Sequence, residues 1–572
     1  MKGFDENKAL RKLRFRQNKN KYIKYGTIGI SCLILVIGIM LFTFAYFQIN
    51  EEFTLINGKL TDLGDYKIAY YKDNQYQNSK PTSDSGVEFD KYTCNKEGVT
   101  LTWDEGEWGP IINSNVSNAK CNVYFKTKTN TWQLPGGVDL YTGMKPIVFE
   151  GSTIKVADTT TEWYNYDKHN WANAALVTSS ARSKSAGATL SESEILQMYV
   201  WIPRYAYKKW EKTNYNSNEQ IIKVILEPSS KKDTNGYVTH PAFTFGTTEL
   251  NGIWVGKFET SATSGIQTTA NQLCTAEGCA NAANIRILPN KISATNNNIF
   301  NMYNASRSIE SNSTFGLTAS QVDTHMMKNT EWGAVAYFTQ SRYGLYKSDG
   351  TCNNASQATS NGCEVFINNV NVGYGNDSTY DVSWQWGPTV TGCSGESVSA
   401  GVNNTHNQTN PTCASGRTWD SLGVLSSTTG NITGVYDMSG GTWEYVMGNM
   451  ANSTTTYTYN AKSSGMTTQP QDKYLDKYLA TATDTTTMSD DNQSKVQNRG
   501  ILGDATTEVM KTYGSLTGAW NSDYAAFVSS SNPWFRRGGR AYNGAYAGVF
   551  AFHRHYGVAD AYASFRVVLS AQ

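Results

Sequence analysis

Aromatic, basic and amide side chains gather near the C-terminus, in the stretch WFRRGGRAYNGAYAGVFAFHRHYGVADAYASFRVVLS that begins at Trp534. Tyr and His supply rigid contact area at little entropic cost, and Arg and Asn add directional hydrogen bonds, a mixture typical of binding loops. The alternative is a solvated hairpin rim that happens to hold aromatic residues. The predicted ligand-binding surface consists of Arg540, Tyr542, Asn543, Ala545, Tyr546, His553, Arg554, His555, Tyr556, Val558, Asp560 and Tyr562.

Residues typical of a buried frame alternate with these positions. Glycines such as Gly538 and Gly557 allow turns and close backbone approach. Val549, Phe550 and Phe552, together with the closing run at 565–569, have the pattern of short buried strands. We therefore expect a stiff frame that carries exchangeable surface residues.

The surface residues divide into expected roles. Four tyrosines would anchor a ligand through aromatic contacts, and three polar residues would set specificity. Because an unperturbed histidine titrates near neutral pH, two histidines predict binding that changes at about pH 6. The anchors are Tyr542, Tyr546, Tyr556 and Tyr562, and the polar residues are Asn543, Arg554 and Asp560.

Metal and catalytic chemistry find little support in the same stretch. On a strand, His553 and His555 would point to one face, but a metal site needs a further ligand, and Asp560 is the nearest carboxylate. No Ser-His-Asp arrangement is recognisable. No Asp, Asn and Glu cluster is dense enough to predict a calcium site. We expect no cofactor and no bound metal, with calcium left open as a possibility.

The composition limits the classes of protein. A chain of 572 residues should form roughly two to four domains. Charged residues make up 17% and the formal net charge is +1, so no nucleic-acid partner is expected. Abundant Gly, Asn, Thr, Ser and Tyr are typical of an exported protein rich in strands and loops.

Eight of the nine cysteines fall in neighbouring pairs, and Cys32 lies in an apolar run. An even number in short-range pairs predicts four local disulfides and an oxidising compartment, with reduced, inert thiols as the alternative. No C-x-x-C spacing suggests a metal site. The predicted pairs are Cys94 with Cys121, Cys274 with Cys279, Cys352 with Cys363, and Cys393 with Cys413.

The N-terminal residues predict a membrane anchor. Residues 1–24 form a basic tail, and residues 25–47 contain no charge over 23 positions, enough for a transmembrane helix. The basic flank predicts a cytoplasmic N-terminus and extracellular C-terminal domains, hence a single-pass protein of the cell membrane. A cleaved signal peptide is the alternative, but no A-x-A site follows the apolar run.

Three further segments follow the predicted anchor. Residues 48–128 predict a small all-β stalk domain, and residues 129–190 a β-hairpin linker region. The pattern changes at about residue 191, where one domain is expected to extend to residue 572. Its best helical material lies between about 283 and 342, and a long polar segment at 343–433 requires disulfide staples.

Several segments together resemble domains of the formylglycine-generating-enzyme type. NTEWGAVAYFTQSRYG at 329–344 is similar to their T-x-x-E-W-x-x-A helix, and GVYDMSGGTWEYVMG at 434–448 to their G-L-Y-D-M-x-G-N-V-W-E-W signature. WVGKFETS at 254–261 resembles an early strand, and RRGGRAYN and SFRVVLS resemble the closing strands. The resemblance implies an α+β, C-type-lectin-like domain over residues 191–572.

The same resemblance bears on catalysis. It implies core and loop-anchoring roles for Trp332, Trp443 and Glu444, while Gly441 departs from the Asn of the pattern. The catalytic members use cysteine thiolates in their C-terminal third, and here no cysteine follows Cys413. The chain is therefore not expected to be an enzyme.

Residues 540–563 also resemble the variable region of target proteins of diversity-generating retroelements. In those systems adenines are randomised, mostly in Asn codons, and the resulting codons cannot encode Lys, Glu, Gln, Met or Trp. None of these five occurs in the 24 residues from 540 to 563. At ordinary usage the five make up about a fifth of a chain, so chance absence has odds of roughly one in a hundred.

These observations predict a membrane-anchored, surface-displayed binding protein with a hypervariable C-terminal site for an unknown protein or surface ligand. Two alternatives remain open. One is an exported formylglycine-generating-type oxidoreductase, and the other is a fixed-specificity adhesin or lectin. The sequence does not identify the ligand or the oligomeric state.

Overall fold

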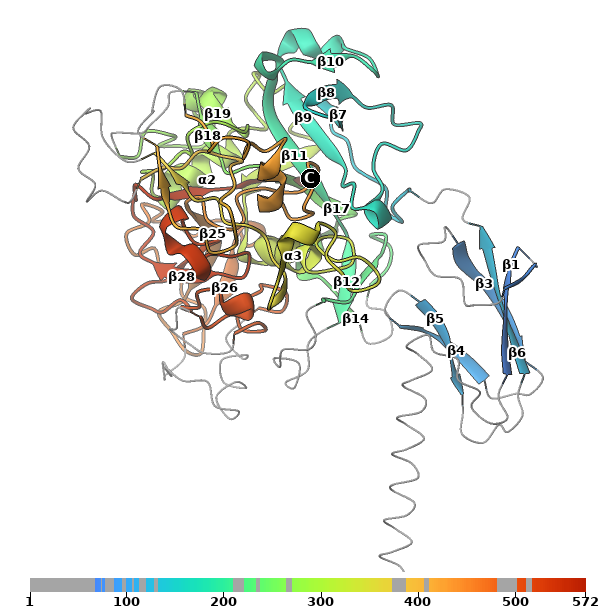
Figure 1. Ribbon diagram of the computed structural model, residues 1–572. Coiled ribbons are helices and arrows are strands. Elements are labelled where there is room, and N and C mark those ends of the chain that lie inside the picture. The colour runs from blue at the N-terminus through green and yellow to red at the C-terminus, as the bar shows by residue number, and fades with distance from the viewer. Residues whose placement is uncertain are drawn as a thin grey trace, which may run out of the picture. The chain divides into compact units, whose positions relative to one another are not determined.

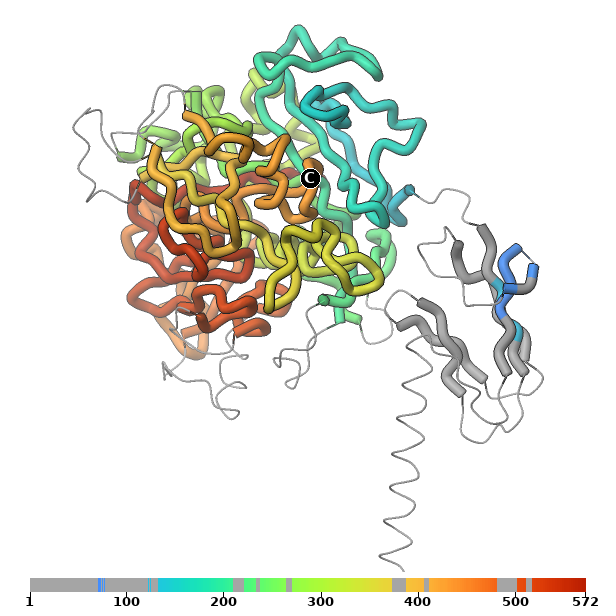
Figure 2. The backbone as a smooth tube through the Cα atoms, viewed as in Figure 1, coloured from blue at the N-terminus to red at the C-terminus, as the bar shows by residue number. Residues whose placement is uncertain are grey.

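The computed structural model describes residues 67–73, 75–77, 87–94, 99–104, 107–112, 120–127, 132–208, 221–232, 237–263, 270–372, 387–405, 411–480, 501–510 and 517–572. The chain separates into two compact units, Met1–Thr129 and Asn130–Gln572, whose backbone is traced in Figure 2.

The described part of the first unit consists of strands. A four-stranded sheet has the order β2-β1-β6-β3 and is accompanied by the β4-β5 hairpin. The register places Cys94 opposite Cys121, but the predicted disulfide between them lies outside the described side chains. The bounds are β1 (Lys67–Lys72), β2 (Gln75–Gln77), β3 (Val87–Cys94), β4 (Val99–Asp104), β5 (Glu107–Ile112) and β6 (Lys120–Thr127).

An eight-stranded sheet dominates the second unit, with the order β10-β8-β7-β9-β11-β17-β30-β20 (Figure 1). All nine residues of β11 are buried, so this central strand reads as an almost continuous apolar run. The last strand, β30, lies between β17 and β20. The bounds are β7 (Met144–Glu150), β8 (Thr153–Val156), β9 (Asn173–Val177), β10 (Thr189–Leu190), β11 (Ile195–Pro203), β17 (Gly252–Gly256), β20 (Val322–Met326) and β30 (Val567–Ala571).

Residues 130–190 belong to this sheet and not to a separate linker. They supply β7, β8, β9 and β10, and β9 pairs directly with β11. The chain divides at residues 129 and 130, so the expected boundary at residue 191 has no counterpart in the contacts. The hairpin pattern was visible in the sequence, but its distant pairing partner was not.

The regular secondary structure of the described residues is mostly strand, with two α-helices, which corrects the expected α+β class. The helices are α2 (Ile299–Arg307) and α3 (Asn329–Thr339), and every residue of α3 is buried. At the start of α3 the Lys328 backbone N–H donates to Glu331 at 2.8 Å. Much of the region expected to be helical is loop, because the apolar residues at 283–298 fill the core without helical periodicity.

A second sheet carries the C-terminal stretch. Its strands pair in the order β26-β25-β27-β28, and β29 pairs with the other end of β25. The buried pair Val549 and Phe550 precedes β28 as a turn and does not form a strand. The bounds are β25 (Trp443–Met450), β26 (Asp476–Tyr478), β27 (Trp534–Arg537), β28 (Phe552–His555) and β29 (Ala563–Phe565).

Short sheets complete the described part of the second unit. They contain β12 (Tyr205–Lys208), β13 (Val224–Leu226), β14 (Tyr237–Thr239), β15 (Thr244–Phe245), β16 (Thr248–Glu249), β18 (Ser261–Ala262), β19 (Ile285–Arg286), β21 (Ala358–Thr359), β22 (Gly362–Cys363), β23 (Val370–Asn371) and β24 (Asn403–Asn404). Three of the predicted disulfides are present, and they fit an oxidising compartment. They join Cys274 to Cys279, Cys352 to Cys363, and Cys393 to Cys413.

Within the described ranges, no helix combines the length and the apolar character needed to cross a membrane. The expected single-pass anchor, and the membrane localisation built on it, therefore find no support in the described residues. The basic tail at 1–24 and the segment at 25–47 that was expected to span lie outside the described residues.

Candidate functional site

Three short elements carry the predicted surface. β27 pairs antiparallel with β28, which places Arg536 opposite His553 and Trp534 opposite His555. Between these strands lies a 3-10 segment, Ala541–Tyr546, here called η12. After β28 the chain turns and enters β29, which pairs in parallel with β25. Residues far apart in sequence therefore form one support.

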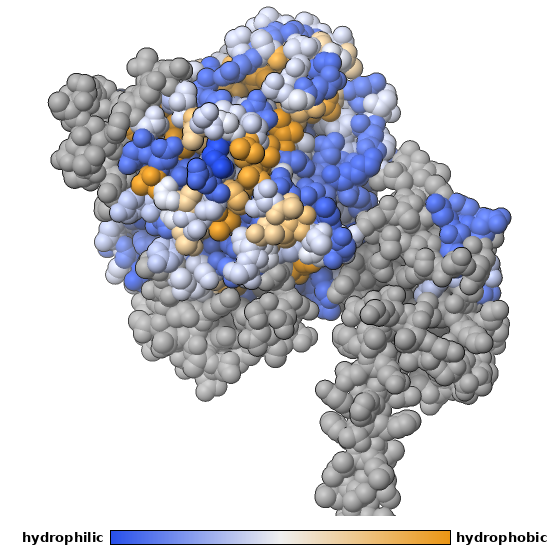
Figure 3. Space-filling model, viewed as in Figure 1, coloured by the Kyte–Doolittle hydropathy of each residue, from blue (hydrophilic) through white to orange (hydrophobic). Residues whose placement is uncertain are grey.

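Eleven of the twelve predicted surface residues are exposed or half-buried. Tyr542 and Tyr556 are 44% and 46% exposed, which sets them among the few large apolar side chains standing free on the described surface. On the face drawn in Figure 3, groups of hydrophobic residues lie among hydrophilic ones. Ala545 is also exposed, and the half-buried residues are Arg540, Asn543, Tyr546, His553, Arg554, His555, Val558 and Tyr562.

Most of the intervening residues are buried. Small residues and glycines fill tight positions, while the larger ones pack into the core of the unit. The stretch thus contains two interleaved sets of side chains that differ in exposure. The buried set is Ala541, Ala547, Gly548, Val549, Phe550, Ala551, Phe552, Gly557 and Ala563.

Hydrogen bonds from distant elements fix the backbone of the buried set. The indole of Trp332 in α3 donates to the Val549 carbonyl at 2.8 Å. The Phe550 N–H donates to the Asp523 carboxylate at 2.9 Å. Both contacts bind backbone atoms, so they constrain the path of the chain without depending on the neighbouring surface side chains.

Arg537 ties β27 to the interior. Its guanidinium donates to Asn329 Oδ1 at 2.9 Å and to the carbonyls of Asp504 and Ala505 at 3.0 Å each. The side chain is fully buried, and burial lowers its pKa to about 10, so it remains charged near neutral pH. The acceptors around it compensate for the loss of water.

Glycine is required at two turns that flank the surface. Gly538 has φ of +83°, and Gly557 has φ of +85°. A Cβ at Gly557 would lie 2.8 Å from Ser464 Cβ and 2.9 Å from Trp534 Cδ1, so close approach as well as backbone conformation excludes other residues.

Asp560 departs from the prediction, because it lies below the surface and not on it. It is 8% exposed, and its carboxylate accepts a hydrogen bond from Arg536 at 2.9 Å. Burial raises the pKa of the Asp560 carboxyl, and Arg536 opposes that shift. A buried ion pair of this kind fixes the loop between β28 and β29, so Asp560 belongs to the frame.

Both histidines differ from the expected pH switch. Burial, followed by repulsion from Arg536, lowers the pKa of His555 to about 3 and that of His553 to about 2. Arg536 lies 3.2 Å from His553 Nδ1. The rings are therefore neutral from pH 5.5 to pH 7.5, and the expectation of a change near pH 6 is corrected.

His555 is held by a residue that the sequence did not mark. The Tyr445 hydroxyl contacts His555 Nδ1 and donates to the Val558 carbonyl at 3.0 Å. His553 packs between Trp443 and Tyr524, with ring centroids 5.5 and 5.2 Å away. In the part of the chain that the structure describes, no three His, Cys, Asp or Glu side chains are grouped as metal ligands.

Arginine and tyrosine side chains stack over the surface. The guanidinium of Arg540 lies 4.8 Å from the Tyr562 ring centroid and 5.7 Å from that of Tyr542. The guanidinium of Arg536 also lies 5.7 Å from the centroid of the Tyr562 ring. Such cation-π contacts hold flat side chains in fixed orientations, which favours binding with little loss of entropy.

The residues of the quoted motifs meet in the core. Arg566 donates to Glu444 at 3.0 Å, and to the carbonyls of Gly256 and Tyr436 at 2.7 and 3.0 Å. Burial raises the pKa of Glu444 to about 7, against the opposing charge of Arg566. Gly441 has φ of +66°, and a Cβ there would lie 2.4 Å from Glu259 Oε1, so this site has no room for the Asn of the motif.

The sequence missed the residues beneath the surface. Arg536, Tyr445 and Trp443 support the histidines, but they lie in segments that were assigned to frame motifs alone. The sequence did contain one signal for Arg536. Side chains alternate along a strand, so Arg536 and Arg537 of β27 are predicted to point to opposite faces. All six cysteines after residue 130 are in disulfides.

Comparison with known proteins gives no family assignment. No protein-family model matches the chain, and no curated protein matches it.

Proposed function

We propose that the second unit is a ligand-binding module whose exposed residues between 540 and 563 can be exchanged while the frame stays fixed. In this proposal the chain is related to target proteins of diversity-generating retroelements and to domains of the formylglycine-generating-enzyme type. It binds a ligand and does not turn it over. The ligand is a protein or another large molecule, and its surface covers the area between the tyrosines.

The proposal rests on the difference in exposure between the two interleaved sets of residues. Residues that would be exchanged are exposed or half-buried, with Asp560 as the exception, and most of the residues between them are buried. A change at an exposed side chain usually alters stability by less than about 0.5 kcal/mol, whereas core truncations cost several times more. The surface can therefore vary without unfolding the unit.

The converging motifs add support. Glu444 and Arg566 come from two of the quoted segments and form a buried ion pair. Trp332 comes from a third, and it binds the backbone in the middle of the variable stretch. These contacts explain why such motif residues accompany a surface that is free to vary.

The surface composition suggests how a ligand is held. Tyr542 and Tyr556 offer exposed aromatic rings, and Arg540 is already oriented by stacking. Aromatic and arginine side chains dominate the energy of most protein interfaces. We expect these three residues to contribute most of the affinity for the ligand of this copy.

The DNA beside the gene tests the proposal. We expect a second copy of the codons for 540–563 that differs mainly at adenines, together with a reverse transcriptase gene. In a population of cells, differences should concentrate at the exposed positions. If neither a repeat nor variation is found, the protein has fixed specificity, as an adhesin or lectin has.

A further inference from the structure

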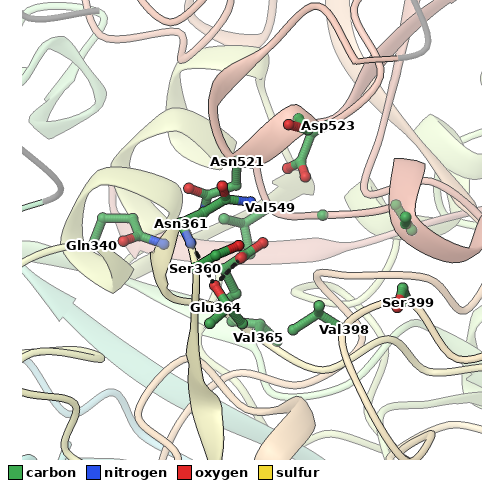
Figure 4. A pocket seen from close by; sticks show the side chains of 15 residues that line it. Gln340, Ser360, Asn361, Glu364, Val365, Val398, Ser399, Asn521, Asp523 and Val549 are labelled. Carbon is green, nitrogen blue, oxygen red and sulfur yellow. Dashed lines mark hydrogen bonds between the residues drawn. The ribbon is translucent and has the colours of Figure 1, made fainter. Parts of the chain in front are cut away.

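A cavity of about 210 Å³ adjoins the candidate surface (Figure 4). Five segments of the second unit supply its lining residues: Gln340 after α3, the β21-β22 hairpin and the residues after it, residues 398–399, residues 521–523, and residues 545–549. Ala545 belongs both to this lining and to the exposed surface set. The cavity and the surface therefore share a border.

The lining offers hydrogen-bond acceptors. It contains the carboxyl groups of Glu364 and Asp523 and no Lys, Arg or His side chain. Gln340 is 1% exposed, and its Oε1 accepts no hydrogen bond from the residues that the structure describes. In Figure 4 the Gln340 side chain forms one wall, with Glu364 and Asp523 on others. An acceptor left unpaired in a polar cavity favours a ligand that donates hydrogen bonds.

The fold fixes both carboxyl groups. Asp523 Oδ2 accepts from the Phe550 N–H at 2.9 Å, and a Cβ at Gly548 would lie 2.0 Å from that oxygen. Glu364 accepts from Thr359 Oγ1 across the β21-β22 hairpin, next to the Cys352–Cys363 disulfide. Gln340 Nε2 donates to the Cys363 carbonyl at 3.1 Å. The site is thus built from positions that other contacts hold in place.

Burial destabilises the charge on both carboxyl groups. Burial raises the pKa of Glu364, and burial together with the Glu364 charge raises the pKa of Asp523 well above its usual range. Arg537 lies close enough to oppose the shift at Asp523, but it does not line the cavity. A cationic ligand would relieve this repulsion inside the cavity.

The volume limits the size of that ligand. An apolar cavity of about 150 Å³ accommodates benzene, so about 210 Å³ accepts a group of a few more heavy atoms. Val365, Val398 and Val549 supply apolar lining beside the acceptors. A short alkyl chain ending in a hydrogen-bond donor matches both parts.

We propose that this cavity is a subsite for an alkylammonium group, with Glu364, Asp523 and the Gln340 Oε1 atom as acceptors. The group comes from a free amine or from a lysine side chain of a larger ligand. The subsite does not depend on variation of the neighbouring surface, but residue 545 controls its mouth. It would bind the same chemical group in every variant that keeps a small residue there.

Titration calorimetry with n-butylammonium chloride tests the proposal on the full chain. We expect saturable binding at one site, at least tenfold tighter than binding of n-butanol, which has the same length and no charge. Nα-acetyl-lysine N-methylamide is the second probe. If this probe binds, the site accepts lysine side chains as well as free amines. If only butylammonium binds, the site accepts free amines alone.

Three variants locate the binding. Glu364→Gln should weaken butylammonium binding at least tenfold, and Ala545→Trp should abolish it by blocking the mouth. Glu162→Gln, at a distant carboxylate paired with Lys168, is the matched control and should leave the affinity unchanged. Thermal unfolding of each variant confirms that it is folded.

Four results would overturn the proposal. They are equal binding of butanol and butylammonium, preference for Ca²⁺ over ammonium, no binding of either amine, or unchanged affinity in both cavity variants. None of these results bears on the exchangeable surface, which is tested at the DNA level.

Discussion

The two faces of the β27-β28 pair use the same residue type for opposite purposes. Arg537 points into the core, where it is fully buried and bound to an α3 side chain and to two carbonyls. Its neighbour Arg536 points to the other face, where it binds Asp560 and lies beside His553. The core face fixes the position of the strand, and the other face supports the side chains that meet a ligand.

This difference shows how a surface can vary on a fixed support. The frame is bound mainly through backbone atoms and buried ion pairs, so it depends little on the exposed side chains for its stability. The surface, in turn, rests on Arg536, Trp443 and Tyr445. Changes at each layer should have separable effects on stability and on binding.

The largest effect is expected on the core face. Arg537→Met leaves three buried acceptors without their donor, so the free energy of unfolding should fall by about 3–5 kcal/mol. Arg554→Met, at a half-buried arginine on β28, is the matched control and should cost about 0.5 kcal/mol or less. Denaturant unfolding of both variants measures the comparison, and equal losses would contradict it.

An intermediate effect is expected from the histidines. Their folded pKa values, about 2 for His553 and about 3 for His555, lie below the unfolded value. The unfolded chain therefore binds more protons, and the histidines' contribution to stability is lost as pH falls from about 7 to about 5, by roughly 1–2 kcal/mol each.

The double variant His553→Asn/His555→Asn isolates this contribution. Buried carboxyls with raised pKa, such as Glu444 and Glu508, both about 7, have the opposite pH dependence, so the wild-type curve alone is not diagnostic. The drop in unfolding free energy between pH 7 and pH 5 should be smaller in the variant, by roughly 2–4 kcal/mol. Parallel curves would mean that the rings titrate normally.

The smallest effect on stability is expected at the exposed tyrosines. Tyr542→Ala and Tyr556→Ala remove side chains that are 44% and 46% exposed, so each should change the unfolding free energy by less than about 0.5 kcal/mol. Phe552→Ala, in the same segment but fully buried, should cost about 3–5 kcal/mol. A loss above about 2 kcal/mol at either tyrosine would place it in the frame.

Local pattern predicted the parts of the fold that depend on neighbours in sequence. The alternation of glycine and apolar residues with polar ones marked most of the buried and exposed positions from 540 to 563, and the apolar run at 195–203 marked the central strand. Short cysteine spacing marked the three observed disulfides for the same reason.

Features that depend on distant contacts were not predicted. Asp560 looked like a surface carboxylate because its partner Arg536 lies 24 positions earlier on a different strand. The cavity brings Glu364 together with Asp523 and Ala545, and no local pattern connects them. The pairing of β9 with β11 likewise placed residues 130–190 in the main sheet, where hairpin periodicity alone suggested a linker.

A library that randomises exposed and half-buried positions of the surface tests the central claim most directly. Codons for Tyr542, Asn543, Ala545, Tyr546, Arg554, Tyr556 and Val558 would be varied together, and the thermal unfolding of individual members measured. We predict that most members unfold cooperatively within about 5 °C of the parent, because the frame contacts remain. A library in which most members fail to fold would contradict the account.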